Sequence, residues 1–343
     1  MTMRKESILP LSGFSLRQKL TWLAAVLMGL MLVAVNVGVY RGTVDFYFTG
    51  VLVVAWINVI LAVSLNLING FTGQFSLGHA GFMAVGAYVS ALLTIHLNWP
   101  FPVVLLLGAL VAALLGFFIG LPTLRLRGDY LAIATLGFGE IVRVVLLNLD
   151  ITGGPRGLGG IFPKTTFFSA EVLAALTIIV IGNIIRSSHG RAFIAVREDE
   201  IAAEAMGIDT TRYKVLAFAI GAAFAGLAGG LFAHHQMFID PRSFTFQRSI
   251  EILVMVVLGG LGSITGSVIA AFVLTILPEA LRGMAEYRMI VYALLLIGLM
   301  LVRPQGLLGT KELRDMLGID RVRWLKAEQP AAGALKSHGG DGR

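Results

Sequence analysis

The chain reads Arg197-Glu198-Asp199-Glu200-Ile201-Ala202-Ala203-Glu204-Ala205-Met206-Gly207 at the centre of a hydrophilic segment, residues 187–214. Long apolar runs flank this segment on both sides, so it cannot lie within a bilayer. Asp199 is a favoured N-cap and Gly207 a favoured residue after a helix C-terminus, which predicts a short helix between them, with Glu198 and Glu200 at its positive end. About 10 Å of helix is too short to be stable alone in water, so we expect it to dock on a soluble partner.

The composition on either side of this segment is that of a membrane protein. Hydrophobic residues make up 57% of the chain and charged residues only 14%, and there are 41 glycines. Glycine is frequent in transmembrane helices because it allows their backbones to approach closely. We therefore predict an all-α, polytopic bundle of membrane helices. The chain has no cysteine, which excludes disulfides and thiolate metal sites.

Apolar runs of roughly 20 residues predict about ten transmembrane helices. They cover residues 20–40, 48–68, 76–97, 102–122, 129–149, 168–185, 213–235, 247–259, 264–281 and 286–302. Most lysines and arginines fall on one side of the membrane if the N-terminus lies in the cytoplasm, as the positive-inside rule requires. This orientation places the segment 187–214 and both termini in the cytoplasm, and it directs the basic charge to anionic lipid rather than nucleic acid.

The same pattern predicts three regions along the chain. Residues 1–19 form a cytoplasmic N-terminal segment, and residues 20–304 form the transmembrane domain with its cytoplasmic loop 187–214. Residues 305–343 form a cytoplasmic tail, in which a short interfacial helix precedes a disordered end.

Two glycine-rich breaks interrupt apolar runs in opposite halves of the chain. The first runs over residues 70–81 and the second over residues 259–266. Paired breaks of this kind indicate internal repeats around a transport path. The alternative is tight helix packing through small residues, for which the spacings Gly116/Gly120, Gly226/Gly230 and Gly262/Gly266 are suited.

Charged and polar side chains inside predicted spans are candidates for a translocation path. Glu140 and Arg143 are three residues apart on one helix face, with Glu140 about 16 Å from the inner edge. They fit either a polar patch for a zwitterionic substrate or a mutually neutralising pair that faces the bundle interior. Around the first break, Asn66, Gln74, Ser76 and His79 either line a path or satisfy the broken backbone.

The sequence offers no catalytic chemistry of its own. It contains no G-x-x-x-x-G-K-[ST] motif, its six histidines are scattered, and no nucleophile has a spaced base. We therefore expect no catalytic, cofactor or metal site in this chain. An ion-coupled secondary transporter stays open as an alternative, although a single Glu–Arg pair is thin for a proton relay.

Several blocks of the sequence resemble the LivM-type permease family of branched-chain amino acid importers, from about residue 50 to residue 308. They include Thr72-Gly73-Gln74-Phe75-Ser76-Leu77-Gly78-His79-Ala80-Gly81-Phe82, residues 124–136, 200–207 and 211–214, Gly259-Gly260-Leu261-Gly262-Ser263 and Arg303-Pro304-Gln305-Gly306-Leu307. The loop resembles the E-A-A-x-x-x-G coupling segment of ATP-binding-cassette permeases, with Ile201 at the Glu position.

The resemblance implies a bacterial inner-membrane permease without enzymatic activity of its own. A second, LivH-like permease, two cytoplasmic ATPases and a periplasmic binding protein would complete the importer. Residues 198–207 would couple ATP hydrolysis to movement of the spans. The implied substrates are leucine, isoleucine and valine, while related systems carry urea, amides or other amino acids.

Overall fold

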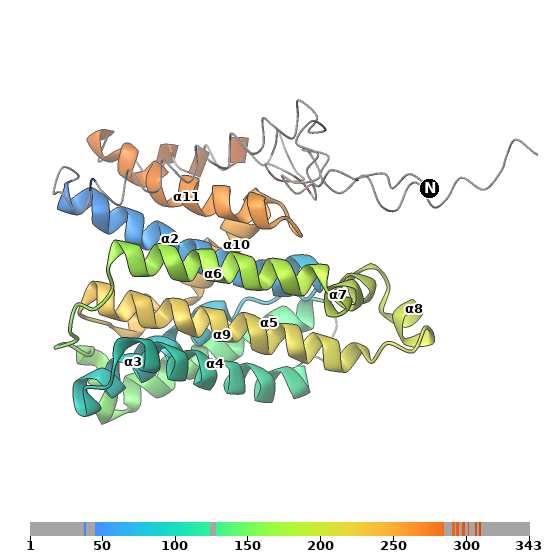
Figure 1. Cartoon of the computed structure of the whole chain (residues 1–343), viewed down its shortest axis with the longest axis horizontal. Coiled ribbons are helices and arrows are strands. Elements are labelled where there is room, and N and C mark those ends of the chain that lie inside the picture. The colour runs from blue at the N-terminus through green and yellow to red at the C-terminus, as the bar shows by residue number, and fades with distance from the viewer. Residues whose placement is uncertain are drawn as a thin grey trace, which may run out of the picture. The chain divides into compact units, whose positions relative to one another are not determined.

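The computed structural model describes residues 45–123 and 128–284, together with residue 38 and scattered positions from 290 to 309. All of these belong to the unit Gly38–Thr310. The predicted span 20–40 lies outside the described residues except for residue 38, and more than half of the span 286–302 lies outside them. The N-terminal segment 1–19 and nearly all of the tail 305–343 also lie outside them. The described part contains helices and no β-strand, which confirms the all-α prediction (Figure 1).

Six helices of the described part are long and apolar enough to cross a membrane. They match the second to seventh predicted spans. These are α2 with the π-turn η1 (Phe46–Asn66 and Leu67–Phe71), α3 (His79–Leu97), α4 (Phe101–Thr123), α5 (Asp129–Asn148), α6 (Phe167–Arg186) and α9 (Thr210–Gln236). The short helices η2 (Asp150–Thr152), η3 (Gly154–Arg156), η4 (Pro241–Ser243) and η5 (Arg282–Met284) lie in connections, and α7 (Ser188–Glu198) and α8 (Glu200–Ala205) follow α6.

The eighth and ninth predicted spans are helices, but each is shorter than a full span. They form α10 (Phe246–Gly259, 14 residues) and α11 (Ile264–Ala280, 17 residues), joined at the second glycine break. Their lengths of about 21 and 26 Å are less than the roughly 30 Å of a hydrocarbon core. Gly260 and Gly262 have positive φ angles, which ends α10 and turns the chain sharply into α11.

Helix α9 lies at the centre of the bundle and packs against α2, α3 and α4. A Cβ atom added to Gly226 of α9 would lie 2.5 Å from the Cβ of Ala112 and 2.9 Å from the carbonyl oxygen of Gly108, both in α4. One added to Gly86 of α3 would lie 2.1 Å from the carbonyl oxygen of Gly226. Similarly tight sites are Gly116, Gly230 and Gly266. Close packing through small residues is thus confirmed at these positions.

Substitution of Gly226 by alanine should destabilise the bundle, because the added methyl group has no room between α4 and α9. Overpacking of this kind costs about 1–3 kcal/mol. The expected result is a lower unfolding midpoint of the purified chain in detergent, followed by circular dichroism. Gly137→Ala in α5 is the matched control, since a Cβ there would meet no heavy atom within 4 Å. Equal midpoints for the two variants would contradict this account of the packing.

Candidate functional site

The hydrophilic segment folds into two short helices, α7 and α8, separated by Asp199. The Asp199 carboxylate accepts hydrogen bonds from the backbone N–H groups of Ile201 (2.9 Å) and Ala202 (3.0 Å), which confirms the predicted N-cap. Gly207 has a φ of +84° and its N–H donates to the carbonyl of Glu204, which confirms the predicted helix end.

The position of Glu198 differs from the prediction. It is the last residue of α7 rather than part of the short helix, and its carboxylate pairs with Arg197. The reason is that the extended backbone of Asp199, with φ −158° and ψ 113°, interrupts the helix between Glu198 and Glu200. Only Glu200 therefore lies in the first turn of α8.

Two polar contacts and one buried side chain fix α8 to the start of α9. Lys214 Nζ lies 2.5 Å from Glu200 Oε1, and Thr210 Oγ1 donates to Glu204 Oε1 at 2.7 Å. Ala203 is buried, with 4% of its surface exposed. A six-residue helix has little stability of its own, so these contacts hold it in place. The contacts thus attach α8 directly to the start of α9.

The exposed side of α8 and its C-cap carries two large apolar side chains. Ile201 is 68% exposed and Met206 is 82% exposed, whereas the other end of the loop buries Phe193 and Val196 of α7. Figure 1 shows α8 at one end of the bundle, beyond the start of α9. Because two large apolar side chains project where the chain itself leaves them uncovered, this end of the molecule is suited to contact another protein.

The two glycine breaks touch each other at Gly70 and Gly262, although these residues are 192 positions apart in sequence (262 − 70). A Cβ atom on Gly70 would lie only 2.4 Å from the backbone nitrogen of Gly262. Asn66, at the end of α2, accepts a hydrogen bond from the Gly262 N–H and donates to the Ser263 carbonyl and the Ser267 hydroxyl, each at 2.9 Å. Its amide thus satisfies the backbone of the second break. These contacts favour the structural interpretation of Asn66 over a place on a path.

Buried polar atoms without a protein partner gather within the first break. Gln74 has neither amide atom hydrogen-bonded, and the Ser76 hydroxyl and His79 Nδ1 also have no partner in the described part of the chain. All three side chains are at most 3% exposed. The other ring nitrogen of His79 lies 2.9 Å from Ser64 Oγ. Since unpaired buried polar atoms cost free energy, this segment favours a polar occupant, as a path would provide.

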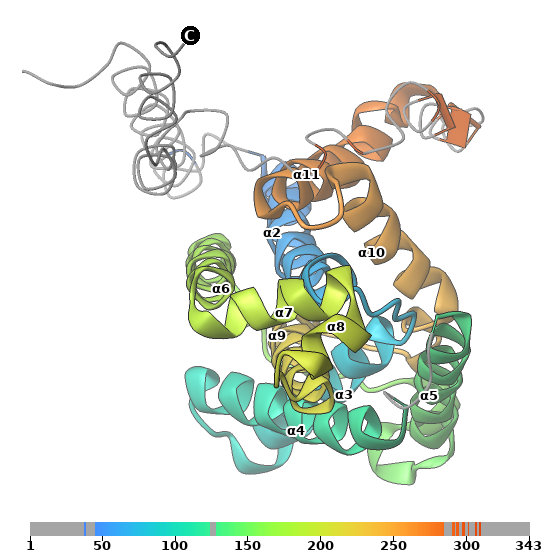
Figure 2. The same ribbon diagram turned by 90° about the vertical axis from the view of Figure 1, so that its right-hand side faces the viewer.

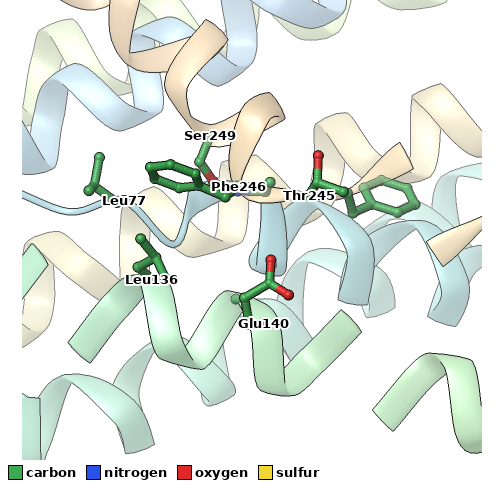
Figure 3. Close-up of a pocket in the computed structure, with 10 residues that line it drawn as sticks. Leu77, Leu136, Glu140, Thr245, Phe246 and Ser249 are labelled. Atoms are coloured by element: carbon green, nitrogen blue, oxygen red, sulfur yellow. Dashed lines mark hydrogen bonds between the residues drawn. The ribbon is translucent and has the colours of Figure 1, made fainter. Parts of the chain in front are cut away.

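Glu140 and Arg143 form the expected ion pair, with Arg143 Nε 2.8 Å from Glu140 Oε2. Their side chains are 35% and 26% exposed, so the pair lies at the edge of the described bundle and not inside it. Glu140 lines a shallow hollow between α5, the start of α3 and the start of α10. Figure 3 shows its carboxylate directed towards the segment that carries Thr245 and Phe246. The structure thus separates this pair from Asn66.

Comparison with known proteins identifies the family. Residues 47–302 match the family described as branched-chain amino acid transport system / permease component. This chain belongs to that family. The permease is 42% identical over 340 residues to the high-affinity branched-chain amino acid transport system permease protein LivM of Salmonella typhimurium, covering 88% of this chain and 77% of the relative.

Two further relatives extend the comparison. LivM of Escherichia coli is 42% identical over 338 residues, with the same coverage of 88% and 77%. The permease protein LivH of Salmonella typhimurium is 28% identical over 287 residues, covering 75% of this chain and 92% of the relative. No solved structure matches the chain. The family is one of transporter permease components and not of enzymes.

Two features of the site were missed by sequence reasoning. From the sequence, Lys214 and Arg197 were expected only to contribute to the positive charge that sets the topology. In the structure, Lys214 holds α8 through Glu200, and Arg197 reaches the first glycine break. Arg197 Nη1 donates to the carbonyl oxygen of Gly70 at 3.0 Å. Glu200 and Lys214 are 14 positions apart, and this spacing gives no local signal that could have predicted their contact.

Proposed function

We propose that this chain is a transmembrane subunit of an ATP-driven importer for leucine, isoleucine and valine. It forms half of the translocation path, and a second, LivH-like permease forms the other half. Two cytoplasmic ATPase subunits supply the energy, and a periplasmic binding protein delivers the amino acid. Membership of the permease family supports the class of transport, and the names of the LivM relatives support the substrates.

The observation that supports the ATP-driven mechanism is the way α8 is attached to α9 and exposed on its other side. Its inner face is clasped to α9 through Glu200, Glu204 and Ala203, while Ile201 and Met206 project outwards. A partner that bound this outer face and moved would displace α9, the central helix of the bundle. Residues 198–207 thus combine an exposed docking surface with a rigid attachment to the spans, which is what coupling to an external ATPase requires.

The topology proposal follows from charge. Arg186, Arg191, Arg197, Arg212 and Lys214 lie around α7 and α8, so the positive-inside rule places this end of the bundle in the cytoplasm. With ten spans, both termini also lie there. The proposed regions are then the segment 1–19, the transmembrane domain 20–304 and the tail 305–343, in a bacterial inner membrane.

The proposed path lies on the side of the bundle that carries α5 and α10, opposite α6 (Figure 2). The apolar windows of α5 and α6 are both only 28% buried, but the Glu140–Arg143 pair lies on α5. Charges at this depth are costly against lipid, so a protein partner or an aqueous path is expected to cover them. Gln74, Ser76 and His79 are the buried polar groups that we place nearest to the path.

Reconstitution tests the proposed function. Proteoliposomes are prepared with this chain, the second permease and the two ATPase subunits, and the binding protein is added with radiolabelled leucine, isoleucine or valine. We expect uptake that requires both ATP and the binding protein. Urea and acetamide should not compete if the substrates are branched-chain amino acids.

A matched preparation containing this chain alone, under a sodium or proton gradient, serves as the control. Uptake by the lone chain on an ion gradient would contradict the proposal and support a secondary transporter. Uptake that depended on ATP but was inhibited by urea or acetamide would still support an ATP-driven importer, but with a substrate other than a branched-chain amino acid.

Charge at the tip of α8 should prevent docking of the ATPase subunits. We expect Ile201→Asp and Met206→Asp to reduce co-purification of the ATPases from mild detergent by tenfold or more, because burial of an apolar side chain contributes about 1.5–3 kcal/mol. Abundance in the membrane should not change, since both side chains are exposed. Met206→Leu, which keeps an apolar side chain, is the matched control. Undiminished co-purification with both aspartate variants would rule out α8 as the docking helix.

Glu140→Gln distinguishes a path residue from a structural one. If the carboxylate lines the path, the variant should be present in the membrane at wild-type abundance but show several-fold lower uptake. If the ion pair only supports assembly, loss of the charge should lower abundance and uptake together, because Arg143 is left uncompensated. Immunoblots measure abundance in the membrane, and uptake is measured per reconstituted complex. A parallel loss of abundance and uptake would show that Glu140 does not line the path.

A further inference from the structure

Arg197 touches both glycine breaks from the last turn of α7. Its Nη1 donates to the carbonyl oxygen of Gly70 at 3.0 Å, and the same nitrogen would lie 3.0 Å from a Cβ atom on Gly262. Its own Cα and Cβ lie 3.2 and 3.3 Å from the position that a Cβ on Gly73 would take. The side chain therefore lies where the two breaks meet, and it reaches there from the loop that carries α8.

The attachment of Arg197 to its own loop is firm. Its guanidinium pairs with the carboxylate of Glu198, and α7 is anchored on the bundle by the buried side chains of Phe193 and Val196. Asp199, the N-cap of α8, is only two residues away. Arginine suits this position because its planar group donates several hydrogen bonds in fixed directions, so one can serve Glu198 and another Gly70.

Both breaks have backbone conformations that depart from a regular α-helix. Gly73, Gly260 and Gly262 have positive φ angles, and η1 is a π-turn, a feature often found at functional sites. Gly70 and Gly262 approach each other closely, with the Asn66 amide beside the contact. The hydrogen bond from a charged donor to the Gly70 carbonyl thus connects Arg197 directly to the place where the two segments meet.

We propose that Arg197 is a positioning residue that transmits displacement of the α7–α8 loop to the paired glycine breaks. The clasp between Glu200 and Lys214 moves α9, and Arg197 moves the breaks at the ends of α2 and α10. The loop is thus connected to the bundle at two places, at α9 and at the glycine breaks. This inference rests on the proposed function, because the movement is driven by ATPase subunits docked on α8.

The test uses the complete reconstituted importer and measures amino acid transported per ATP hydrolysed. Arg197→Met keeps the length and apolar stem of the side chain but removes every donor. We expect the ratio to fall roughly tenfold, as for loss of a hydrogen bond from a charged group, with ATP hydrolysis and complex assembly retained. Arg197→Lys, which can still donate to Gly70, should recover most of the ratio. Arg191→Met, at an exposed arginine of the same helix, should match the wild type.

An unchanged ratio in Arg197→Met would overturn the proposal, and so would a failure of Arg197→Lys to recover more of the ratio than Arg197→Met. If the wild-type complex shows no ATP-dependent uptake, it is the proposed function that fails, and the variants are not compared. The ratio separates transmission from a purely structural role, which would lower assembled complex and both rates together.

Hydrogen exchange gives a second measurement that does not depend on transport. In Arg197→Met, and in Arg197→Gln should the methionine variant assemble poorly, amides of residues 67–76 and 259–266 should exchange several-fold faster than in the wild type, because the link to Gly70 no longer restrains them. Amides of α4 provide the internal control. Equal exchange at both breaks in wild type and variant would overturn the proposal.

Discussion

The close approach of the two glycine breaks is the constraint on which the rest of the described bundle depends. Gly70 and Gly262 lie backbone against backbone, and any side chain at Gly70 would separate them. The amide of Asn66 accepts a hydrogen bond from the buried N–H of Gly262 and donates one to the carbonyl of Ser263. The end of α2, the end of α10 and the start of α11 are thereby held at one point, which Arg197 reaches from α7.

The loop between α6 and α9 acts on the bundle through two different kinds of contact. The contact with α9 is an ion pair between Lys214 and Glu200. The contact with the breaks is a single hydrogen bond to a carbonyl in a segment rich in glycine, whose backbone is conformationally permissive. In the proposed mechanism, one short helix that is stable only when anchored would reorient a span and open a break at the same time.

Much of this architecture can be predicted from local sequence patterns. A helix that crosses lipid must be apolar for about 20 residues, so hydropathy located α2 to α6 and α9 to within about three residues at each end. Asp199 and Gly207 predicted the ends of the short helix because their roles as cap and left-handed turn are local. The Glu140–Arg143 contact also followed from helical spacing alone.

The features that sequence could not provide join residues far apart in the chain. The pairing of Asn66 with Gly262, of Arg197 with Gly70 and of Glu200 with Lys214 each depends on tertiary packing that no periodicity encodes. The segments predicted at 247–259 and 264–281 agree with the ends of α10 and α11 to within about one residue, but hydropathy is the same whether or not two apolar runs around a glycine turn each cross the membrane. Glu198 was assigned to the wrong helix because the break at Asp199 is set by one extended residue.

The π-turn at Leu67–Phe71 sets the rotation about the helix axis between α2 and the residues that follow it. A π-turn is equivalent to one extra residue in an α-helix, and one residue corresponds to about 100° of rotation about the axis. Deleting a single residue here would restore a regular helix and swing the Gly70 carbonyl away from the guanidinium by more than a quarter turn. The register of this one turn therefore sets the direction in which the end of α2 faces the loop, and lineages that keep the loop are expected to tolerate neither insertion nor deletion in it.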